Sequence, residues 1–211
     1  MPELEVRLSG SGGQGILLIG RILAEALTLE KLNVAQSQSY EPTSRGGLSR
    51  SDLVASSDQV DYPLATSLDY LVILHNIAVG VSDELLKSTS LVLIDSSLDG
   101  QYCAPDGRAV LLPIIETARG LGSIRSTNMV ALGALLALGE ICEQENVIEA
   151  IKRVAPTRLV ESAIDGVKEG YRLAAYGEPK GSDSIDPIDP IDPIDQSRIT
   201  STQIIESINR V

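Results

Sequence analysis

The residues best suited to hold a ligand form a glycine-rich turn near the start of the chain. Gly10, Gly12 and Gly15 have the spacing G-x-G-x-x-G between two apolar segments. The first glycine of such a turn permits a tight bend, the second lets the backbone approach a phosphate, and the third lets a helix pack on a strand. Free N–H groups at the start of the helix favour an anion. The candidate site therefore comprises Gly10, Ser11, Gly12, Gly13, Gln14 and Gly15, although a strand–helix turn without a ligand would need the same glycines.

A second polar loop, residues 37–50, follows about 25 residues later. Arg45 could contact a phosphate or carboxylate through two parallel hydrogen bonds. Gly46 and Gly47 let the backbone come close, and Ser49 adds a hydroxyl. This loop is expected to act as an anion clamp, or to dock another protein chain, beside the glycine turn. The alternative is a surface loop whose arginine pairs with a carboxylate of its own chain.

Other kinds of site find less support in the sequence. Cys103, Cys142 and His75 are too few to make the four-ligand zinc and iron–sulfur sites, so no metal site is expected and the cysteines are expected to be free thiols in a reducing cytosol. His75 is expected to be structural, although its place just after an apolar strand also allows a polar role at a site. No Gly-Lys-Ser/Thr follows the glycines, so the turn is not a P-loop, and residues 34–38 lack the terminal acid that binds the ribose of NAD.

Composition narrows the class of protein further. The chain has 211 residues, suited to one main domain, and 43% are hydrophobic with no Trp or Phe, so the core must be aliphatic. The net charge of −12 disfavours nucleic acid binding. Because no secretory signal and no apolar run of about 18 residues is visible, we expect a cytoplasmic protein that does not span a membrane.

The elements that must position these residues alternate between strand and helix. Strands are expected at residues 4–8, 33–38, 52–55, 60–62, 70–74, 90–95 and 109–112, and helices at 15–30, 126–143, 146–154 and 159–176, with a short helix near 82–86. This order predicts an α/β three-layer sandwich with a mostly parallel sheet, a Rossmann-like glycine turn and a helical C-terminal half. The helix from residue 126 is apolar on all sides, so it should lie between the sheet and another element, and Gly133 indicates close packing there.

The end of the chain has a different composition. Residues 185–195 repeat Ile-Asp-Pro, in which each Pro fixes φ and removes a hydrogen-bond donor. We therefore divide the chain into an α/β domain at 1–177, an extended Asp-Pro-rich linker at 178–200, and residues 201–211. The last segment is expected to be either a short docking helix or a frayed tail.

Four ordered motifs resemble the γ subunit, or γ domain, of 2-oxoacid:ferredoxin oxidoreductases, and most closely their 2-oxoglutarate branch. They are the turn at residues 10–15, the stretch at 37–50, and the segments 61–63 and 128–133, and the resemblance extends over residues 3–176. The second stretch departs from the family pattern, because Glu41-Pro42-Thr43 stands where Gly-Pro-Glu is usual.

The resemblance implies a subunit that is not catalytic alone. The complex would oxidatively decarboxylate a 2-oxoacid on thiamine diphosphate, transfer the acyl group to coenzyme A, and pass electrons through iron–sulfur clusters to ferredoxin. Thiamine diphosphate and the clusters would be held by α and β, and in some complexes δ, partner subunits. The γ domain lies near the coenzyme A side, which makes the turn and Arg45, Gly46, Gly47 and Ser49 candidates for phosphate contact or assembly. An indolepyruvate or pyruvate oxidoreductase subunit, a free-standing nucleotide-binding oxidoreductase, and a scaffold without a ligand remain alternatives.

Overall fold

The computed structural model describes residues 4–41, 46–60, 62–105 and 107–176, all within one compact unit. Arg45 and the segments 178–200 and 201–211 lie outside the described residues.

The domain is built on a six-stranded mixed sheet with the order β2-β3-β1-β4-β5-β6. The strands are β1 (Leu4–Ser11), β2 (Asn33–Tyr40), β3 (Leu48–Ser56), β4 (Leu68–Ile73), β5 (Leu86–Asp95) and β6 (Arg108–Leu112). Three neighbouring pairs, β1–β4, β4–β5 and β5–β6, are parallel, whereas β3 runs antiparallel to both β1 and β2. The expected α/β fold with mostly parallel pairing is confirmed, with an antiparallel hairpin added at one edge.

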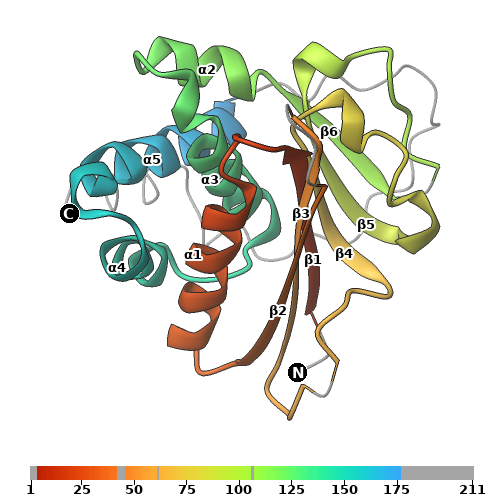
Figure 1. The fold of residues 1–211 in the computed structure, drawn as a ribbon, viewed down its shortest axis with the longest axis horizontal. Coiled ribbons are helices and arrows are strands. Elements are labelled where there is room, and N and C mark those ends of the chain that lie inside the picture. The colour runs from red at the N-terminus through yellow and green to blue at the C-terminus, as the bar shows by residue number, and fades with distance from the viewer. Residues whose placement is uncertain (1–3, 42–45, 61, 106, 177–211) are drawn as a thin grey trace, which may run out of the picture. The chain divides into compact units, whose positions relative to one another are not determined.

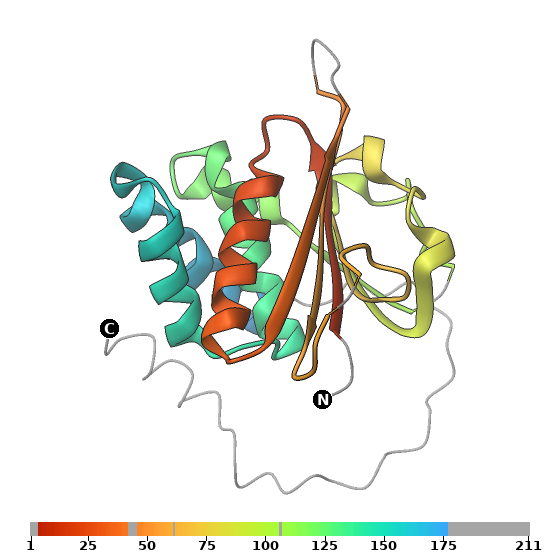
Figure 2. The same cartoon turned by 60° about the horizontal axis from the view of Figure 1, so that its bottom comes forward.

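The sheet separates two unlike layers (Figures 1 and 2). One face is covered by α1 (Ile16–Leu29), α2 (Ile114–Gly120), α3 (Thr127–Gly139), α4 (Gln144–Val154) and α5 (Val160–Tyr176). The other is covered by loops and the short 3-10 helices η1 (Asn76–Ala78), η2 (Asp83–Leu85) and η3 (Ser96–Leu98). The third layer therefore consists of turns rather than of α-helices.

Aliphatic side chains fill both interfaces, as a sequence without Phe or Trp requires. The larger core joins the sheet to the helices and includes the fully buried Leu8, Ile19, Leu93 and Leu132. The smaller core lies under the 3-10 helices and includes Leu71 and several buried neighbours. Successive residues of one strand thus serve different cores, as the two-residue repeat of a strand dictates.

Helix α3 lies buried between the sheet and α5, as its apolar sequence predicts. A Cβ atom on Gly133 would overlap the carbonyl oxygen of Val167 in α5, and one on Gly170 would overlap that of Val130 in α3. The two glycines therefore let the backbones of α3 and α5 touch, which offsets the cost of about 1 kcal/mol that each glycine carries in a helix.

Several element boundaries differ from the sequence-based expectations. Strand β3 begins at Leu48 rather than at residue 52, because it pairs with β1 from Leu48 and with β2 from Ser49. Val60 and Tyr62 are not in a strand, so that expectation is wrong for both; residue 61 lies outside the described residues. Helix α3 ends at Gly139, since Glu140 adopts a left-handed conformation with φ 47°.

Two further differences concern short helices. The segment near residue 82 is a single 3-10 turn, η2, and Leu86 already belongs to β5. Helix α2 was not expected, since its seven residues follow Pro113 directly and are too few for a clear helical repeat.

Candidate functional site

The glycine turn and the second loop lie side by side at the carboxyl end of β1. In the β1–β3 ladder, Gly10 pairs with Ser49 and Ser11 with Leu48. Beyond the ladder, the N–H of Gly12 donates to the carbonyl oxygen of Gly47 over 2.8 Å. Antiparallel pairing thus brings together two segments that are more than 30 residues apart, while Arg45 falls outside the described residues.

This place is also where the connections of neighbouring strands diverge. The chain leaves β1 through α1 on the helical face, whereas it leaves the parallel strand β4 through η1 on the opposite face (Figure 2). In open α/β sheets such a divergence at the carboxyl ends of strands is the usual position of a ligand site. The topology therefore singles out the ends of β1 and β4.

The side chain of Gln14 joins the ends of these two strands. Its Oε1 accepts a hydrogen bond from the N–H of Ser11 over 2.7 Å, and its Nε2 donates to the carbonyl oxygen of Leu74 over 3.1 Å. A Cβ atom on Gly10 would collide with this side chain and with Ile16. Both polar ends of Gln14 are therefore used to hold the turn, and its contribution to the site is to fix the backbone.

Gly15 is required by its conformation and by its neighbour. It is the N-cap of α1 with φ 74°, a left-handed conformation that side chains disfavour. A Cβ atom there would overlap Nδ2 of Asn128, which donates to the carbonyl oxygen of Gly15 over 3.2 Å. The third glycine of the motif thus admits a side chain from α3, in addition to allowing the turn.

The turn leaves several backbone donors available. The N–H groups of Gly13, Gly15, Ile16 and Leu17 have no hydrogen-bond acceptor among the described residues. The first turn of α1 also contains no acidic residue. Because the helix dipole adds positive potential here, these donors can stabilise an anion. The donors of Ser11 and Gly12, by contrast, are already bonded within the protein.

Two residues of this region were not among the expected site residues. Asn128 begins the family-like segment 128–133, and its proximity to Gly15 follows only from the packing of α3 beside α1. Arg50 ends the second polar stretch; it is half-buried on β3 and has no ion-pair partner among the described residues. The sequence signal for both was their place within a motif.

The residues considered for nucleophilic chemistry have structural surroundings. His75 caps η1, where its Nδ1 accepts a hydrogen bond from the N–H of Ile77 over 3.3 Å. Both cysteines are free thiols, Cys103 exposed and Cys142 half-buried. Burial raises the pKa of Cys142 to about 12, with further contributions from the charges of Glu30 and Glu143, so this thiol is not activated.

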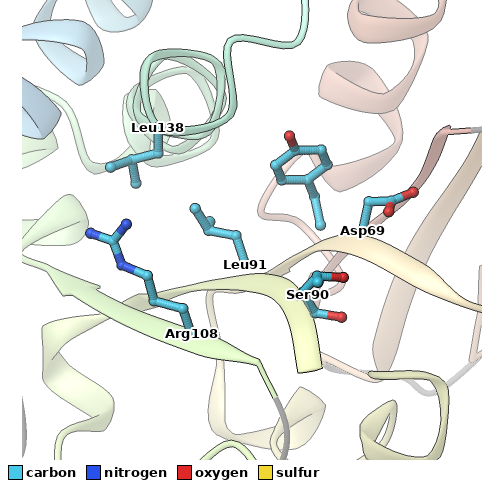
Figure 3. A pocket seen from close by; sticks show the side chains of 7 residues that line it. Asp69, Ser90, Leu91, Arg108 and Leu138 are labelled. Atoms are coloured by element: carbon cyan, nitrogen blue, oxygen red, sulfur yellow. The ribbon is translucent and has the colours of Figure 1, made fainter. Parts of the chain in front are cut away.

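A small cavity lies elsewhere, on the helical face near the amino ends of β4 and β6. It measures about 280 Å³ and is lined by residues of β4, β5, β6 and α3: Asp69, Tyr70, Thr89, Ser90, Leu91, Arg108 and Leu138. Leu138 lies above Leu91, with Arg108 and Asp69 on opposite sides (Figure 3). The Tyr70 hydroxyl donates to the carbonyl oxygen of Gly139 over 2.9 Å. The cavity therefore lies near the amino ends of the parallel strands, whereas the glycine turn lies at the carboxyl end of β1.

Within the described ranges, no group of three or more His, Cys, Asp and Glu side chains is placed to hold a metal ion. In the same ranges, no helix is both long and apolar enough to cross a bilayer.

Comparison with known proteins places the chain in a class. Residues 5–173 match the family model of pyruvate ferredoxin/flavodoxin oxidoreductases. The fold, with its glycine turn beside an antiparallel hairpin, also superposes on the γ subunit of a keto/oxoacid ferredoxin oxidoreductase from Geobacter sulfurreducens. That superposition has a TM-score of 0.73 at 32% identity and covers 83% of this chain and 98% of the other. The chain belongs to this family, as a γ-type subunit of the 2-oxoacid:ferredoxin oxidoreductases.

The particular relatives are named for 2-oxoglutarate. The chain is 35% identical over 172 residues to the 2-oxoglutarate synthase subunit KorC of Archaeoglobus fulgidus, covering 81% of this chain and 88% of KorC. It also resembles part of the 2-oxoglutarate:ferredoxin oxidoreductase of Magnetococcus marinus, solved with 2-oxoglutarate, coenzyme A and succinyl-CoA bound. There the identity is 26% and the TM-score 0.71, over 82% of this chain but only 31% of the longer one. The same domain thus occurs both as a separate subunit and within a larger chain.

Proposed function

We propose that this chain is the γ subunit of a 2-oxoglutarate:ferredoxin oxidoreductase and supports coenzyme A-dependent oxidative decarboxylation by the assembled complex. The observation that carries the proposal is the 35% identity to KorC, which spans most of both chains. The likeness to an oxidoreductase solved with 2-oxoglutarate and coenzyme A bound supports the same substrates.

The chemistry of the reaction belongs to partner subunits in this proposal. The full sequence has two cysteines and one histidine, fewer ligands than an iron–sulfur cluster requires. It also lacks the Gly-Asp-Gly…Asn motif of thiamine diphosphate sites. The α and β subunits, with δ in some complexes, would hold thiamine diphosphate and the clusters and pass electrons to ferredoxin.

The proposed contribution of this chain is an anion site for the phosphate groups of coenzyme A. The turn at residues 10–15 would present the N–H groups of Gly13 and Gly15, followed by those of Ile16 and Leu17. Each hydrogen bond to a charged phosphate contributes about 1.5–3 kcal/mol. Gly46, Gly47 and Ser49 shape the neighbouring wall, and Arg45 would supply a guanidinium from the same loop. Gln14 and Asn128 would act by holding the turn in place.

A free-standing NAD-binding oxidoreductase is the main alternative outside the family, and the topology argues against it. In a dinucleotide-binding fold the second strand lies next to the first and ends in an acid that binds ribose. Here β3 separates β2 from β1, and β2 ends at Tyr40 without an acid. The next residue, Glu41, accepts a hydrogen bond from the N–H of Leu48 over 3.3 Å.

The decisive experiment is reconstitution with the α and β subunits purified from the same native complex. Turnover should require all subunits, coenzyme A and an electron acceptor such as a viologen dye, and should be faster with 2-oxoglutarate than with pyruvate or indolepyruvate. Turnover by this chain alone would refute the subunit assignment, and a preference for pyruvate or indolepyruvate would move it to another branch.

The anion clamp has its own test in the same system. Arg45→Ala should raise the KM for coenzyme A, or weaken assembly, by about tenfold to a hundredfold, because a bidentate contact contributes about 1.5–3 kcal/mol. Arg119→Ala, an exposed arginine of α2, is the matched control. Unchanged kinetics and assembly for Arg45→Ala would exclude the clamp, whereas lost stability with normal kinetics would indicate an internal ion pair.

A further inference from the structure

The face of β1 turned away from α1 is polar along its whole length. Glu5, Arg7, Ser9 and Ser11 alternate with core residues on this strand, and all four are buried. This face points toward the connection between β4 and β5, because Nη1 of Arg7 donates a hydrogen bond over 3.1 Å to the hydroxyl of Ser82 in that connection. A row of buried polar groups on a strand requires partners for each of them.

The charged groups of one row on this face are paired with each other. The guanidinium of Arg7 binds Asp52 on β3 through two hydrogen bonds, Nε to Oδ1 over 2.7 Å and Nη2 to Oδ2 over 2.6 Å. Arg7 and Asp52 are directly opposite each other in the β1–β3 register. The pair is buried and cancels its own charge, so Asp52 is not available to another cation.

The next row toward the glycine turn is not satisfied. Ser39, Arg50 and Ser9 lie opposite one another across β2, β3 and β1. Since side chains alternate along each strand, all three share the face of Arg7 and Asp52. Opposed residues in antiparallel strands have Cβ atoms about 4.5–5.5 Å apart, so the hydroxyls flank the arginine.

The two inner members of this row lack partners. The Ser9 hydroxyl is buried, with 1% of the residue exposed, and has no hydrogen-bond partner in the described part of the chain. Arg50 is half-buried and makes no ion pair with any described carboxylate. Glu41, which follows β2 directly, uses its Oε2 to accept a hydrogen bond from the N–H of Leu48. Among the described residues, the row therefore combines an arginine that has no ion-pair partner with a buried hydroxyl that has no hydrogen-bond partner.

We propose that Ser9, Arg50 and Ser39 form a second anion subsite, which binds the phosphate or carboxylate group of a small molecule. A guanidinium flanked by hydroxyls offers only donors and one positive charge, which is the complement of an oxyanion. The subsite lies on the opposite face of the sheet from the helix donors of the glycine turn. It goes beyond the role proposed for that turn and does not depend on it.

The test is NMR on the full chain at constant ionic strength, with inorganic phosphate and succinate as the added anions. The Nε–Hε resonance of Arg50 should shift in a saturable way with at least one of them. Ser9→Ala should weaken anion binding by about tenfold, the effect of losing about 1.4 kcal/mol. Arg50→Gln should weaken it by a similar factor; because this variant has no Arg50 resonance, its binding is followed through the backbone amides of Ser9 and Ser39. Arg21→Gln removes an equal charge from the exposed face of α1 and should change the affinity less than about twofold.

Ser9→Ala separates a binding role from a structural one. Because the hydroxyl has no partner among the residues that the structure describes, removing it should leave thermal stability unchanged or slightly higher while weakening anion binding. A loss of stability with an unchanged Arg50 titration would overturn the proposal.

The same spectra separate this subsite from the glycine turn. If only the amides of Gly13, Gly15 and Leu17 shift, the anion binds at the glycine turn and the proposal of a second subsite is wrong. If only Arg50 shifts, the second subsite is supported and anion binding at the glycine turn is not. If neither anion moves Arg50 and Arg50→Gln instead weakens association with the partner subunits, then Arg50 contacts a protein chain and the proposal is wrong.

Discussion

Asn128 and Gly15 are 113 residues apart in the chain, yet the side-chain amide of Asn128 donates a hydrogen bond to the Gly15 carbonyl oxygen over 3.2 Å. Asn128 is buried, and its Oδ1 accepts a second bond from the N–H of Met129 over 2.9 Å. The start of α3 thereby fixes Gly15, the N-cap of α1. The conformation of the glycine turn is thus determined by tertiary packing as well as by its glycines.

Replacing Gly15 with Ala should destabilise the fold by about 2–3 kcal/mol. The left-handed backbone costs about 1–2 kcal/mol in a non-glycine residue, and displacing Asn128 sacrifices a hydrogen bond worth about 1 kcal/mol. Urea unfolding of the full chain measures the effect. When Asn128 is already replaced by Ala, Gly15→Ala should lower the free energy of unfolding only by the cost of the left-handed backbone, about 1–2 kcal/mol.

Gly13→Ala is the matched control for the combination of Gly15→Ala with Asn128→Ala. Gly13 also has a positive φ, 91°, but a Cβ atom there meets nothing within 4 Å. Its cost should be about 1–2 kcal/mol and independent of Asn128. Equal coupling of both glycines to Asn128 would show that the clash at Gly15 is not what determines its cost.

Gln14→Ala should lower the free energy of unfolding by about 1–2 kcal/mol. The substitution leaves the N–H of Ser11 and the carbonyl of Leu74 without their partner, and each loses a hydrogen bond of about 1 kcal/mol. Gln38→Ala, on the exposed end of β2, should stay within about 0.5 kcal/mol of the parent protein. Chemical denaturation compares the two, and equal small effects would mean that the bridge does not hold the turn.

The thiol of Cys142 should make the fold less stable in alkali. Its pKa is raised to about 12 by burial and by Glu30 and Glu143, whereas an unfolded cysteine ionises near 8.5. As the pH rises, the unfolded chain therefore loses the thiol proton before the folded chain does, which favours unfolding. The stability that the neutral thiol contributes is fully present below pH 8.5 and is lost as the pH rises toward 12. Stability measured between pH 8 and 11 should fall less steeply in Cys142→Ala than in the control Cys103→Ala.

The same difference should appear in chemical labelling. At pH 8, iodoacetamide should modify the exposed Cys103 at least about tenfold faster than Cys142 in the native protein, and peptide mapping distinguishes the two. Equal rates would contradict the assigned burial.

Removing residues 178–211 should change the melting temperature of the α/β domain by less than about 5 °C. Each Pro of the Ile-Asp-Pro repeat lacks an N–H donor and disfavours both helices and interior strands, so the sequence predicts that this segment adds little to the stability of the core. Thermal unfolding of the full and shortened chains tests this. A larger drop would mean that the segment docks on the domain.

Much of the fold can be predicted because its strands and helices carry strong local patterns. Apolar runs predict β4 and β5, and the uniformly apolar α3 predicts its burial under α5. The antiparallel position of β3 has no such signal, since Ser49, Arg50 and Ser51 look like loop residues and become a strand only by pairing on both sides. Local sequence contains no information about which strand will lie beside another.

The candidate site shows the same division. Gly15, the third glycine of the motif, permits the close approach to a helix that the motif suggests, whereas the positive φ of Gly13, which is not a motif glycine, was not expected. That Gln14 would bond to Leu74, and that Gly12 would bond to Gly47 rather than keep a free donor, depends on which loops meet in space. The anion role of residues 10–15 and of Arg45, Gly46, Gly47 and Ser49 stays a prediction.

The backbone contact between α3 and α5 has a mechanical consequence. Because Gly133 and Gly170 each lie against a carbonyl of the other helix, a larger side chain at either position would push the backbones of α3 and α5 apart. Asn128, at the start of α3, bonds to the carbonyl oxygen of Gly15, so we expect such a separation to disturb the glycine turn as well. The spacing between α3 and α5 is thus one of the dimensions on which the shape of the turn depends.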